Sequence, residues 1–166
     1  MGRWNRIAQI PLPEDGDPSR CLHFSVLYTL LNSGLKMNGT CYDLNWVRIS
    51  TSISIAVPKN YCVPAALIVD FTTAKSTIVN YLVHKTDYDT FSLVGSPDRT
   101  YLLILSRKRM MKWEVYLQLK KFAHKLGYDI SKLRVDYNSI KNKKCGTCRS
   151  DIYDNKSNSY TCKCIS

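Results

Sequence analysis

The sequence predicts an all-β fold with one helix: about eight strands in a meander, as in a β-sandwich or an eight-stranded antiparallel up-and-down β-barrel, followed by a C-terminal α-helix. Short apolar and aromatic runs separated by turn residues occupy the first two thirds of the chain. Residues 46–57 alternate between apolar and polar side chains, and apolar residues recur at helical spacing between residues 111 and 126. A chain of 166 residues suits one domain with a sizeable core, and 45% hydrophobic and 22% charged residues argue against disorder.

The strands are expected where these apolar runs lie. Residues 46–57 show the clearest alternation, because Val47, Ile49, Ile53, Ile55 and Val57 share one parity and serines fill much of the other. The expected strands cover residues 22–30, 35–42, 46–57, 65–71, 77–84, 90–94 and 101–106. All the connections between them are short, and antiparallel closure into a barrel leaves no sheet edge open.

One helix is expected over residues 110–126. Its apolar stripe includes Val115, Leu119 and Phe122, and Gly127 stands where a helix commonly ends on a glycine. A short strand is expected at residues 133–135, and after Ser139 the chain is polar and rich in cysteine, without periodicity. This pattern predicts a barrel unit with its helix over residues 1–136 and a basic, cysteine-rich tail over residues 137–166.

The formal net charge of +11 lies almost entirely in the last third of the chain. Residues 1–106 hold nine Lys or Arg against eight Asp or Glu, whereas residues 107–166 hold fifteen against five. A uniformly basic nucleic-acid-binding protein is therefore not expected. The pattern instead indicates a basic outer face whose partner would be an anionic membrane surface, an acidic glycan or an acidic receptor, or a solvated face without a partner.

The cysteines point to an oxidising compartment. Seven cysteines in a small basic chain favour disulfides, and the odd number leaves one thiol unpaired or paired between chains. We therefore expect a monomer or a weak dimer. Met1 is followed directly by Gly2-Arg3-Trp4 without an apolar leader, which by itself indicates a cytosolic chain. Because the cysteines indicate the opposite, we expect a secreted protein whose natural N-terminus is incomplete in this sequence.

Three short motifs, in order along the chain, resemble those of the lipocalin family, and most closely its apolipoprotein D and insect bilin-binding branch. Gly2-Arg3-Trp4 resembles the G-x-W opening of the first strand, and Thr86-Asp87-Tyr88 resembles the T-D-Y motif. Residues 101–107 resemble the third motif, in which Arg107 ends the last barrel strand. The phrase over residues 127–133, GYDISKL, is typical of that branch, so the resemblance covers roughly residues 1–136.

The resemblance implies structural roles for the motif residues. The Trp4 indole would fill one end of the barrel, and the Arg107 guanidinium would lie on its ring face in a cation–π contact of about 1–2 kcal/mol. Gly2 would allow the backbone to bend closely beside that ring. These residues, with Thr86, Asp87 and Tyr88, would specify the fold and not a catalytic site.

The resemblance also implies a function, because an eight-stranded barrel of this family is wide enough to hold one small apolar ligand. The ligand would be a tetrapyrrole such as biliverdin, a retinoid, a fatty acid or a steroid, bound without a cofactor. Matching the family's strands and following the alternation predicts which side chains face inward and contact it: Phe24, Val26, Tyr28, Val47, Ile49, Thr51, Ile53, Tyr101 and Leu103. Leu105 would face inward with them, and Tyr28 and Tyr101 would orient the ligand.

The resemblance further implies a disulfide from Cys21 to the C-terminal segment, with Cys145 or Cys148 as its partner. Cys41 and Cys62 have no counterpart in the family pattern. The expected departures from the family are the missing segment before Gly2 and a shortened connection between residues 94 and 101.

The C-terminal cysteines also suit a second class of protein. Cys145 and Cys148, followed by Cys162 and Cys164, have a spacing that could ligate zinc in a small nucleic-acid or anionic-surface binding module, although C-x-C is a poor zinc knuckle. An enzyme is not expected, because the chain carries none of the common catalytic motifs. His23, in a strand, and His124, on a helix flank, are expected to be solvated.

Overall fold

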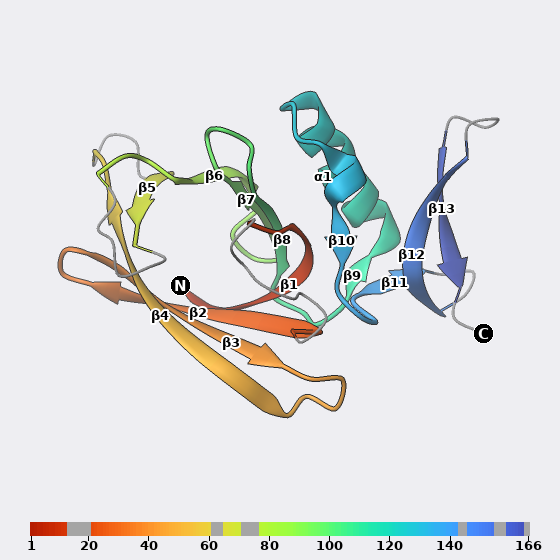
Figure 1. Ribbon diagram of the computed structural model, residues 1–166, viewed down its shortest axis with the longest axis horizontal. Coiled ribbons are helices and arrows are strands. Elements are labelled where there is room, and N and C mark those ends of the chain that lie inside the picture. Colours follow the sequence, from red (N-terminus) through yellow and green to blue (C-terminus); the bar gives the residue numbers. More distant parts are fainter. Residues whose placement is uncertain (13–20, 61–64, 71–76, 143–145, 155–158, 165–166) are drawn as a thin grey trace.

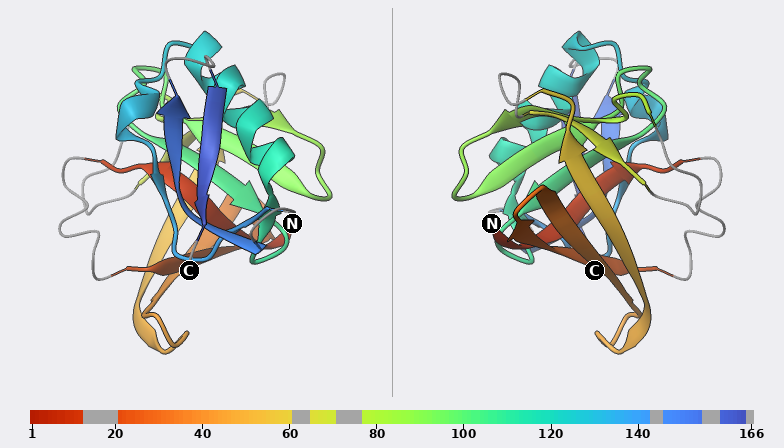
Figure 2. Two further views of the ribbon diagram at one scale, coloured as in Figure 1. Left: turned by 90° about the vertical axis from the view of Figure 1, so that its right-hand side faces the viewer. Right: turned by 90° about the vertical axis from the view of Figure 1, so that its left-hand side faces the viewer.

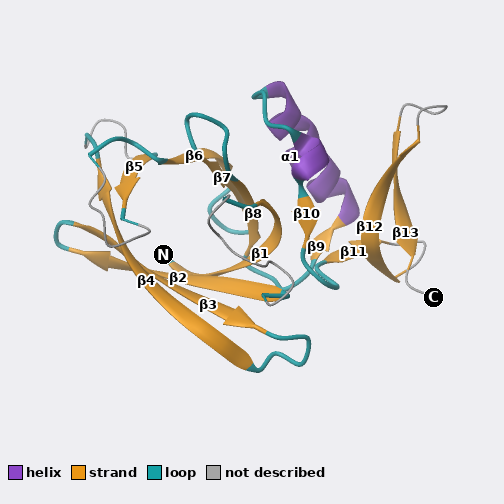
Figure 3. Cartoon of the chain, viewed as in Figure 1, coloured by secondary structure: helices purple, strands orange, loops and turns teal. Residues whose placement is uncertain are grey.

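The structure is a computed structural model that describes residues 1–12, 21–60, 65–70, 77–142, 146–154 and 159–164, and from residue 142 onward only the course of the backbone. Strands dominate, and one α-helix lies among them (Figure 3). In chain order the elements are β1 Gly2–Ile10, β2 His23–Leu31, β3 Gly34–Tyr42, β4 Arg48–Pro58, β5 Ala66–Val69, β6 Tyr81–Thr86, β7 Phe91–Gly95, β8 Leu102–Ser106, β9 Met111–Lys112, α1 Trp113–Lys125, the 3-10 helix η2 Ile130–Lys132, β10 Arg134–Val135, β11 Ile140–Asn142, β12 Gly146–Asp154 and β13 Ser159–Cys164.

Strands β1 to β8 form the predicted barrel. Each strand pairs antiparallel with the next, and β1 pairs with β8 to close the ring, with Asn5 opposite Ser106 and Ile10 opposite Leu102. Strand β10 pairs with the C-terminal end of β1, with Ala8 opposite Val135. The eight-stranded up-and-down fold predicted from the sequence is therefore confirmed.

Two hydrophobic clusters divide the core. One lies between α1 and the outside of β1, β7 and β8, and it includes Ile7, Leu93, Ile104, Tyr116 and Leu119. The other lies on the inner face of the barrel. Figures 1 and 2 show that α1 stands on one side of the barrel, while β2, β3 and β4 form the opposite side.

The helix ends as predicted and begins later than predicted. Gly127 follows it with a φ of +89°, a left-handed conformation that a glycine adopts without strain. Met111 and Lys112 are not helical, because they form β9, which pairs in parallel with β11. Lys112 caps the helix without a side-chain hydrogen bond, in keeping with the lack of an N-cap residue in the sequence.

The segment after Ser139 contains regular structure that its lack of periodicity did not indicate. Strands β9, β11, β12 and β13 form a second, four-stranded sheet, and α1 lies between its β12–β13 hairpin and the barrel (Figure 1). Several strand boundaries also differ from expectation, since β4 begins at Arg48 and not at residue 46, β5 spans only Ala66–Val69, and β6 begins at Tyr81 and not at residue 77.

Candidate functional site

The inner face of the barrel carries most of the residues that were predicted to contact a ligand. Val26 and Tyr101 are buried in the inner cluster, and Phe24, Tyr28 and Leu103 are partly buried against it. Leu105 belongs to the same cluster, whereas Leu102 and Ile104, of the other parity, pack against the helix side. The structure therefore brings these predicted positions together, and their contact with a ligand stays a prediction.

The orientation predicted for the apolar residues of β4 and its preceding turn is wrong. Val47, Ile49 and Ile53 are 59%, 50% and 62% exposed, and Thr51 is exposed too. Strand pairing shows why, because opposite residues share a face and Met37, in the inner cluster, lies opposite Ser54. The inner parity of β4 is thus Ser50, Ser52, Ser54 and Ala56, and Ile53 lies on the outer face.

Three tyrosines place hydroxyl groups on the inner side. The hydroxyls of Tyr28 and Tyr81 lie 2.5 Å apart, and the Tyr101 hydroxyl donates to the backbone carbonyl of Asn80 at 2.6 Å. Asn80 is itself fixed, since its side chain accepts from the Val69 N–H at 2.8 Å and donates to the Val69 carbonyl at 2.7 Å. The site thus has polar atoms held by backbone contacts within an apolar surface.

Burial keeps these hydroxyls neutral. It raises the pKa of Tyr28 to about 12, although the hydrogen bond from Tyr81 acts in the opposite direction. It also raises the pKa of Tyr81 and of Tyr101 well above the ordinary value. At physiological pH these groups are therefore neutral and can each donate or accept a hydrogen bond.

A buried ion pair lies beside this surface. Arg6, on β1, extends from the inner parity, and its guanidinium lies 5.2 Å from the centroid of the Phe24 ring. Its Nε donates to Asp136 Oδ1 at 2.9 Å and to Oδ2 at 3.0 Å. It also donates to Gln9 Oε1 at 2.8 Å and to the Cys21 carbonyl at 3.1 Å, so its hydrogen-bonding groups are engaged on several sides.

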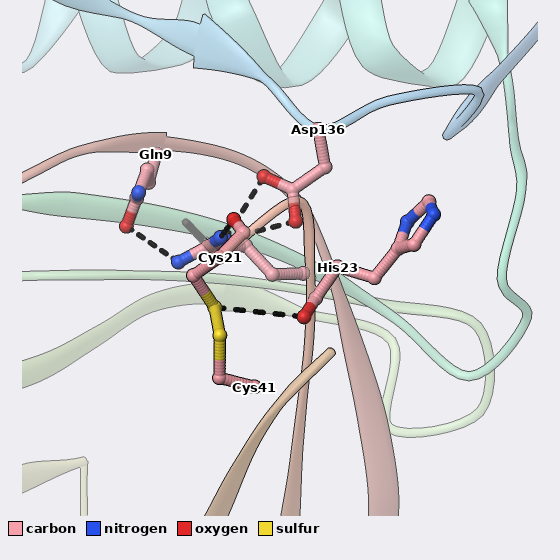
Figure 4. Close-up of a disulfide and its surroundings, with 6 residues drawn as sticks. Gln9, Cys21, His23, Cys41 and Asp136 are labelled. Carbon is pink, nitrogen blue, oxygen red and sulfur yellow. Dashed lines mark hydrogen bonds and ion pairs between the residues drawn. A yellow bond between two sulfur atoms is a disulfide. The ribbon is translucent and has the colours of Figure 1, made fainter. Parts of the chain in front are cut away.

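The disulfide predicted for Cys21 is wrong in its partner. Cys21 is bonded to Cys41, with their Cα atoms 5.4 Å apart, next to Gln9 and Asp136 (Figure 4). The reason is the pairing of β2 with β3, which sets Phe24 opposite Cys41 and brings the start of β2 to the end of β3. Cys145, the first of the two predicted partners, lies outside the described residues, and nothing is described of the Cys148 side chain.

The residues of the first and third motifs contact one another. The Arg107 guanidinium lies 3.8 Å from the centroid of the Trp4 ring and donates to the Arg3 and Tyr88 carbonyls. Gly2 has a φ of +97°, and a Cβ there would lie 3.2 Å from Arg107.

The T-D-Y motif makes the turn between β6 and β7. Thr86 donates to the Phe91 carbonyl, and Asp87 Oδ1 accepts the N–H groups of Asp89, Thr90 and Phe91. Although desolvation opposes the change, the hydrogen bonds from Thr90 and from these backbone groups lower the pKa of Asp87 to about 2. The motif therefore specifies a turn.

Several residues near the inner face were not predicted from the sequence. Tyr81 and Met37 lie in expected strands for which the sequence did not predict which side chains face inward. The pairing of Met37 with β2 and of Tyr81 with β5 shows that both lie on the inner face. His23, expected to be solvated, is buried and stacks on Trp46 with ring centroids 4.1 Å apart. Burial and Arg109 lower its pKa, and the guanidinium of Arg109 lies 4.0 Å from the Trp46 ring centroid.

Within the part of the chain that the structure describes, no group of three or more His, Cys, Asp or Glu side chains could hold a metal ion, and the side chains of the four cysteines in the zinc alternative lie outside that part. In the same residues no helix is both long and apolar enough to cross a membrane.

The barrel, its inner face and the supporting motifs define the class of small β-barrel proteins with a flanking helix. A family model described as a lipocalin-like domain matches residues 1–138, and the chain belongs to this family. The temperature-induced lipocalin-1 of Arabidopsis thaliana is 32% identical over 146 residues, which cover 80% of this chain and 74% of that protein.

Solved structures share the fold. Lobster apocrustacyanin A1 superimposes with a TM-score of 0.61 at 13% identity, covering 81% of this chain and 74% of that one. The siderocalin Ex-FABP superimposes with a TM-score of 0.53 at 12% identity, covering 81% of this chain and 91% of that one. At such identities these similarities show a common architecture.

Proposed function

We propose that this protein is a non-enzymatic carrier that binds one small, uncharged hydrophobic ligand on the inner face of its barrel. Members of the lipocalin family generally bind small hydrophobic ligands. The observation that carries the finer proposal is the combination of an apolar inner surface with the neutral hydroxyls of Tyr28, Tyr81 and Tyr101. A ligand with an apolar body and one hydroxyl or carbonyl group, such as a retinoid alcohol or a steroid, matches this surface.

The apolar part of the affinity would come from covering side chains that the barrel leaves partly accessible. Phe24, Leu35, Val83 and Leu103 are only partly buried against the inner cluster. Burial of apolar surface is favourable by about 25 cal/mol per Å², and the loss of ligand motion offsets part of that gain. These residues therefore provide affinity without selecting a particular ligand.

Selection would come from charge. Among the described strand positions that face inward, Arg6 alone is ionised, and Asp136 neutralises it. A ligand carboxylate on this surface would lose its hydration and find no unpaired cation to contact. Burying such an unpaired charge is costly. A neutral alcohol would instead exchange hydrogen bonds with the tyrosine hydroxyls, so the site favours the alcohol over the acid.

Quenching of tryptophan fluorescence by retinol and by retinoic acid tests this preference with two ligands of one shape. We expect retinol to bind about tenfold more tightly or better. Removing the hydroxyl pair with Tyr28→Phe and Tyr81→Phe should weaken retinol binding by about five- to tenfold, since each hydrogen bond contributes about 1 kcal/mol. Tyr88→Phe is the matched control, because the Tyr88 side chain is 77% exposed.

Three outcomes would contradict the proposal. The first is tighter binding of the acid than of the alcohol. The second is equal loss in the Tyr88 control. The third is no quenching by either ligand from a protein with an intact circular dichroism spectrum.

We also propose that the protein acts in an oxidising, extracellular setting, which the Cys21–Cys41 disulfide supports. A place in the apolipoprotein D and bilin-binding branch rests on the motifs described above, whereas a bilin pigment carries two carboxylates and is not the ligand that this surface favours. An acidic partner for the basic helix and tail remains a prediction, supported by the exposed Lys121 and Lys125 of α1.

A further inference from the structure

The outer face of β2, β3 and β4 can be mapped row by row from the strand pairing. Opposite residues lie on the same face of a sheet. One row runs Arg3, Leu27, Asn38 and Ile53 across β1 to β4, because these residues are partners in register. The neighbouring row contains Lys36 and Ile55, and the row beyond it contains Val57 opposite Ile68.

Aliphatic side chains on these rows are exposed. Ile53 is 62% exposed, and Ile55, Val57 and Leu27 are 39%, 41% and 37% exposed. This face is not covered by α1, which packs on β1, β7 and β8 on the other side of the barrel (Figures 1 and 2). Several exposed aliphatic residues gathered on one sheet face are unusual for a protein surface without a partner.

The charged residues on the rows across β1 to β4 are cationic, and the acidic Asp70 lies at the β5 end of the Ile55 row, where its backbone N–H donates to the Ile55 carbonyl. Arg3 and Lys36 lie on the aliphatic rows, and Arg48 lies opposite Tyr42 at one end of β4. Within the described part of the chain, these three side chains form no ion pair. The nearby Asp43 instead accepts the backbone N–H groups of Asn45 and Val47 in its own turn.

We propose that the outer face of β2, β3 and β4, defined by Leu27, Ile53, Ile55, Val57, Arg3, Lys36 and Arg48, docks on the surface of an anionic lipid bilayer. The aliphatic side chains would enter the headgroup boundary, and the cations would contact anionic headgroups. Charge complementarity selects this occupant over a second copy of the chain. Two such faces packed together would bring three cations of one copy against three of the other, while the acidic Asp43 and Asp70 lie at the margins of the face.

Sedimentation with vesicles tests the proposal on the full chain. We expect binding to vesicles of phosphatidylcholine with about one third phosphatidylserine, at an affinity about tenfold or more above that for phosphatidylcholine alone. Ile53→Thr with Ile55→Thr, a pair that keeps high strand propensity, should weaken binding to the anionic vesicles about tenfold or more. Lys36→Glu with Arg48→Glu should weaken it to a similar degree.

The matched control is Lys132→Glu with Arg134→Glu, because it changes the net charge equally and both exposed side chains lie outside α1, the tail and the outer face of β2, β3 and β4. The control variant should lose no more than about twofold in affinity, the part that comes from non-specific attraction. An Ile55→Trp variant gives a readout that does not depend on loss of binding. The emission of its added indole should shift to the blue on anionic vesicles and be quenched by brominated lipid.

The proposal is overturned if the control variant loses as much affinity as the outer-face variants, or if the wild-type chain does not bind anionic vesicles. It is also overturned if brominated lipid quenches the Ile55→Trp variant no more than it quenches wild type. A wild-type dimer in analytical ultracentrifugation that the two threonine substitutions convert to a monomer would assign the face to a second copy instead. Circular dichroism melts identify any variant that fails to fold, and the Ile55→Trp readout then decides.

Discussion

Arg6 and Asp136 are 130 positions apart in the sequence and form a buried ion pair in which Arg6 Nε contacts both carboxylate oxygens, at 2.9 and 3.0 Å. The same guanidinium donates to Gln9 and to the Cys21 carbonyl. The Asp136 backbone N–H donates to the Ile7 carbonyl, so the contact joins β1 to the segment after β10 at two points. Arg6 therefore fixes the C-terminal segment against the barrel.

Replacing Arg6 tests this role. Arg6→Met should lower the free energy of unfolding by about 3–5 kcal/mol, because it leaves Asp136 and two further acceptors buried without a donor. Urea denaturation measures the loss. The control is Arg3→Met, whose side chain is exposed and should cost less than about 1 kcal/mol. Equal losses in both variants would show that the ion pair has no special structural weight.

The pH dependence of stability should carry a signature of Asp136. Burial raises the pKa of Asp136 to about 6, against the opposing effect of Arg6. The folded state therefore holds this proton more tightly than the unfolded state, whose pKa is near 3.8. The contribution of Asp136 is fully present below about pH 4, and it is lost as the pH rises to about 6, by about 3 kcal/mol.

The comparison that isolates this effect is wild type against Asp136→Asn, since asparagine does not titrate. Urea midpoints at half-unit steps from pH 4 to pH 7 should show the advantage of wild type shrinking as the pH rises. If the advantage grows instead, the Arg6 contact outweighs burial and the carboxylate is ionised throughout this range.

The disulfide predicts which two peptides of the oxidised protein are covalently linked. A digest of the oxidised protein should contain the peptide with Cys21 linked to the peptide with Cys41, as the structure shows. Cys41→Ser should lower stability by about 3 kcal/mol, because the bond closes a loop of about 20 residues. Finding Cys21 linked to Cys145 or Cys148 in wild type would restore the pairing that the family resemblance implied.

Tyr128 couples the end of the helix to the barrel. Its hydroxyl donates to the Ser96 carbonyl at 2.8 Å, so His84 Nε2, at 2.7 Å, must act as the donor to it. Tyr128→Phe should cost about 1–3 kcal/mol in a thermal or urea melt, because it leaves the buried Ser96 carbonyl without this partner. The exposed hydroxyl of Tyr88 serves as the control, and Tyr88→Phe should be neutral.

His84 provides a second measurement on the same contact. Burial and Arg99 lower its pKa below the ordinary value of 6.5. Its contribution to stability is therefore present above about pH 6.5 and is lost as the pH falls through that value toward the pKa of the folded state. An NMR titration that places the His84 midpoint at or above 6.5 would contradict this.

The alternation over residues 46–57 was enough to predict β4, but it assigned the inner face wrongly. Periodicity distinguishes two faces of a strand without saying which of them faces the inside. The usual rule places apolar residues inside, and here the inner parity carries Ser50, Ser52 and Ser54 while Ile53 and Ile55 are exposed. On β2 and β8 the motif residues anchored the parity, and Val26 and Tyr101 lie in the inner cluster.

Contacts between residues that are far apart in the chain could not be predicted from the sequence. Asp136 is one of five acidic residues in a basic segment, and no local pattern marks it as the partner of Arg6. The pairing of Cys21 with Cys41 follows from the register of β2 on β3, which a hairpin turn suggests only approximately. The Tyr28–Tyr81 pair depends on strands that meet only when the barrel closes.

Strand β1 has a consequence for the order in which the protein is made. Residues 4–10 are all buried, and the strand pairs with β2, β8 and β10. The ribosome therefore synthesises one of the most enclosed strands before all of its partners, and two of these, β8 and β10, lie far behind it in the sequence. Until residue 135 has emerged, a nascent chain carries an unpaired strand edge, and a transcript cut short before β8 should yield a protein that aggregates or is degraded.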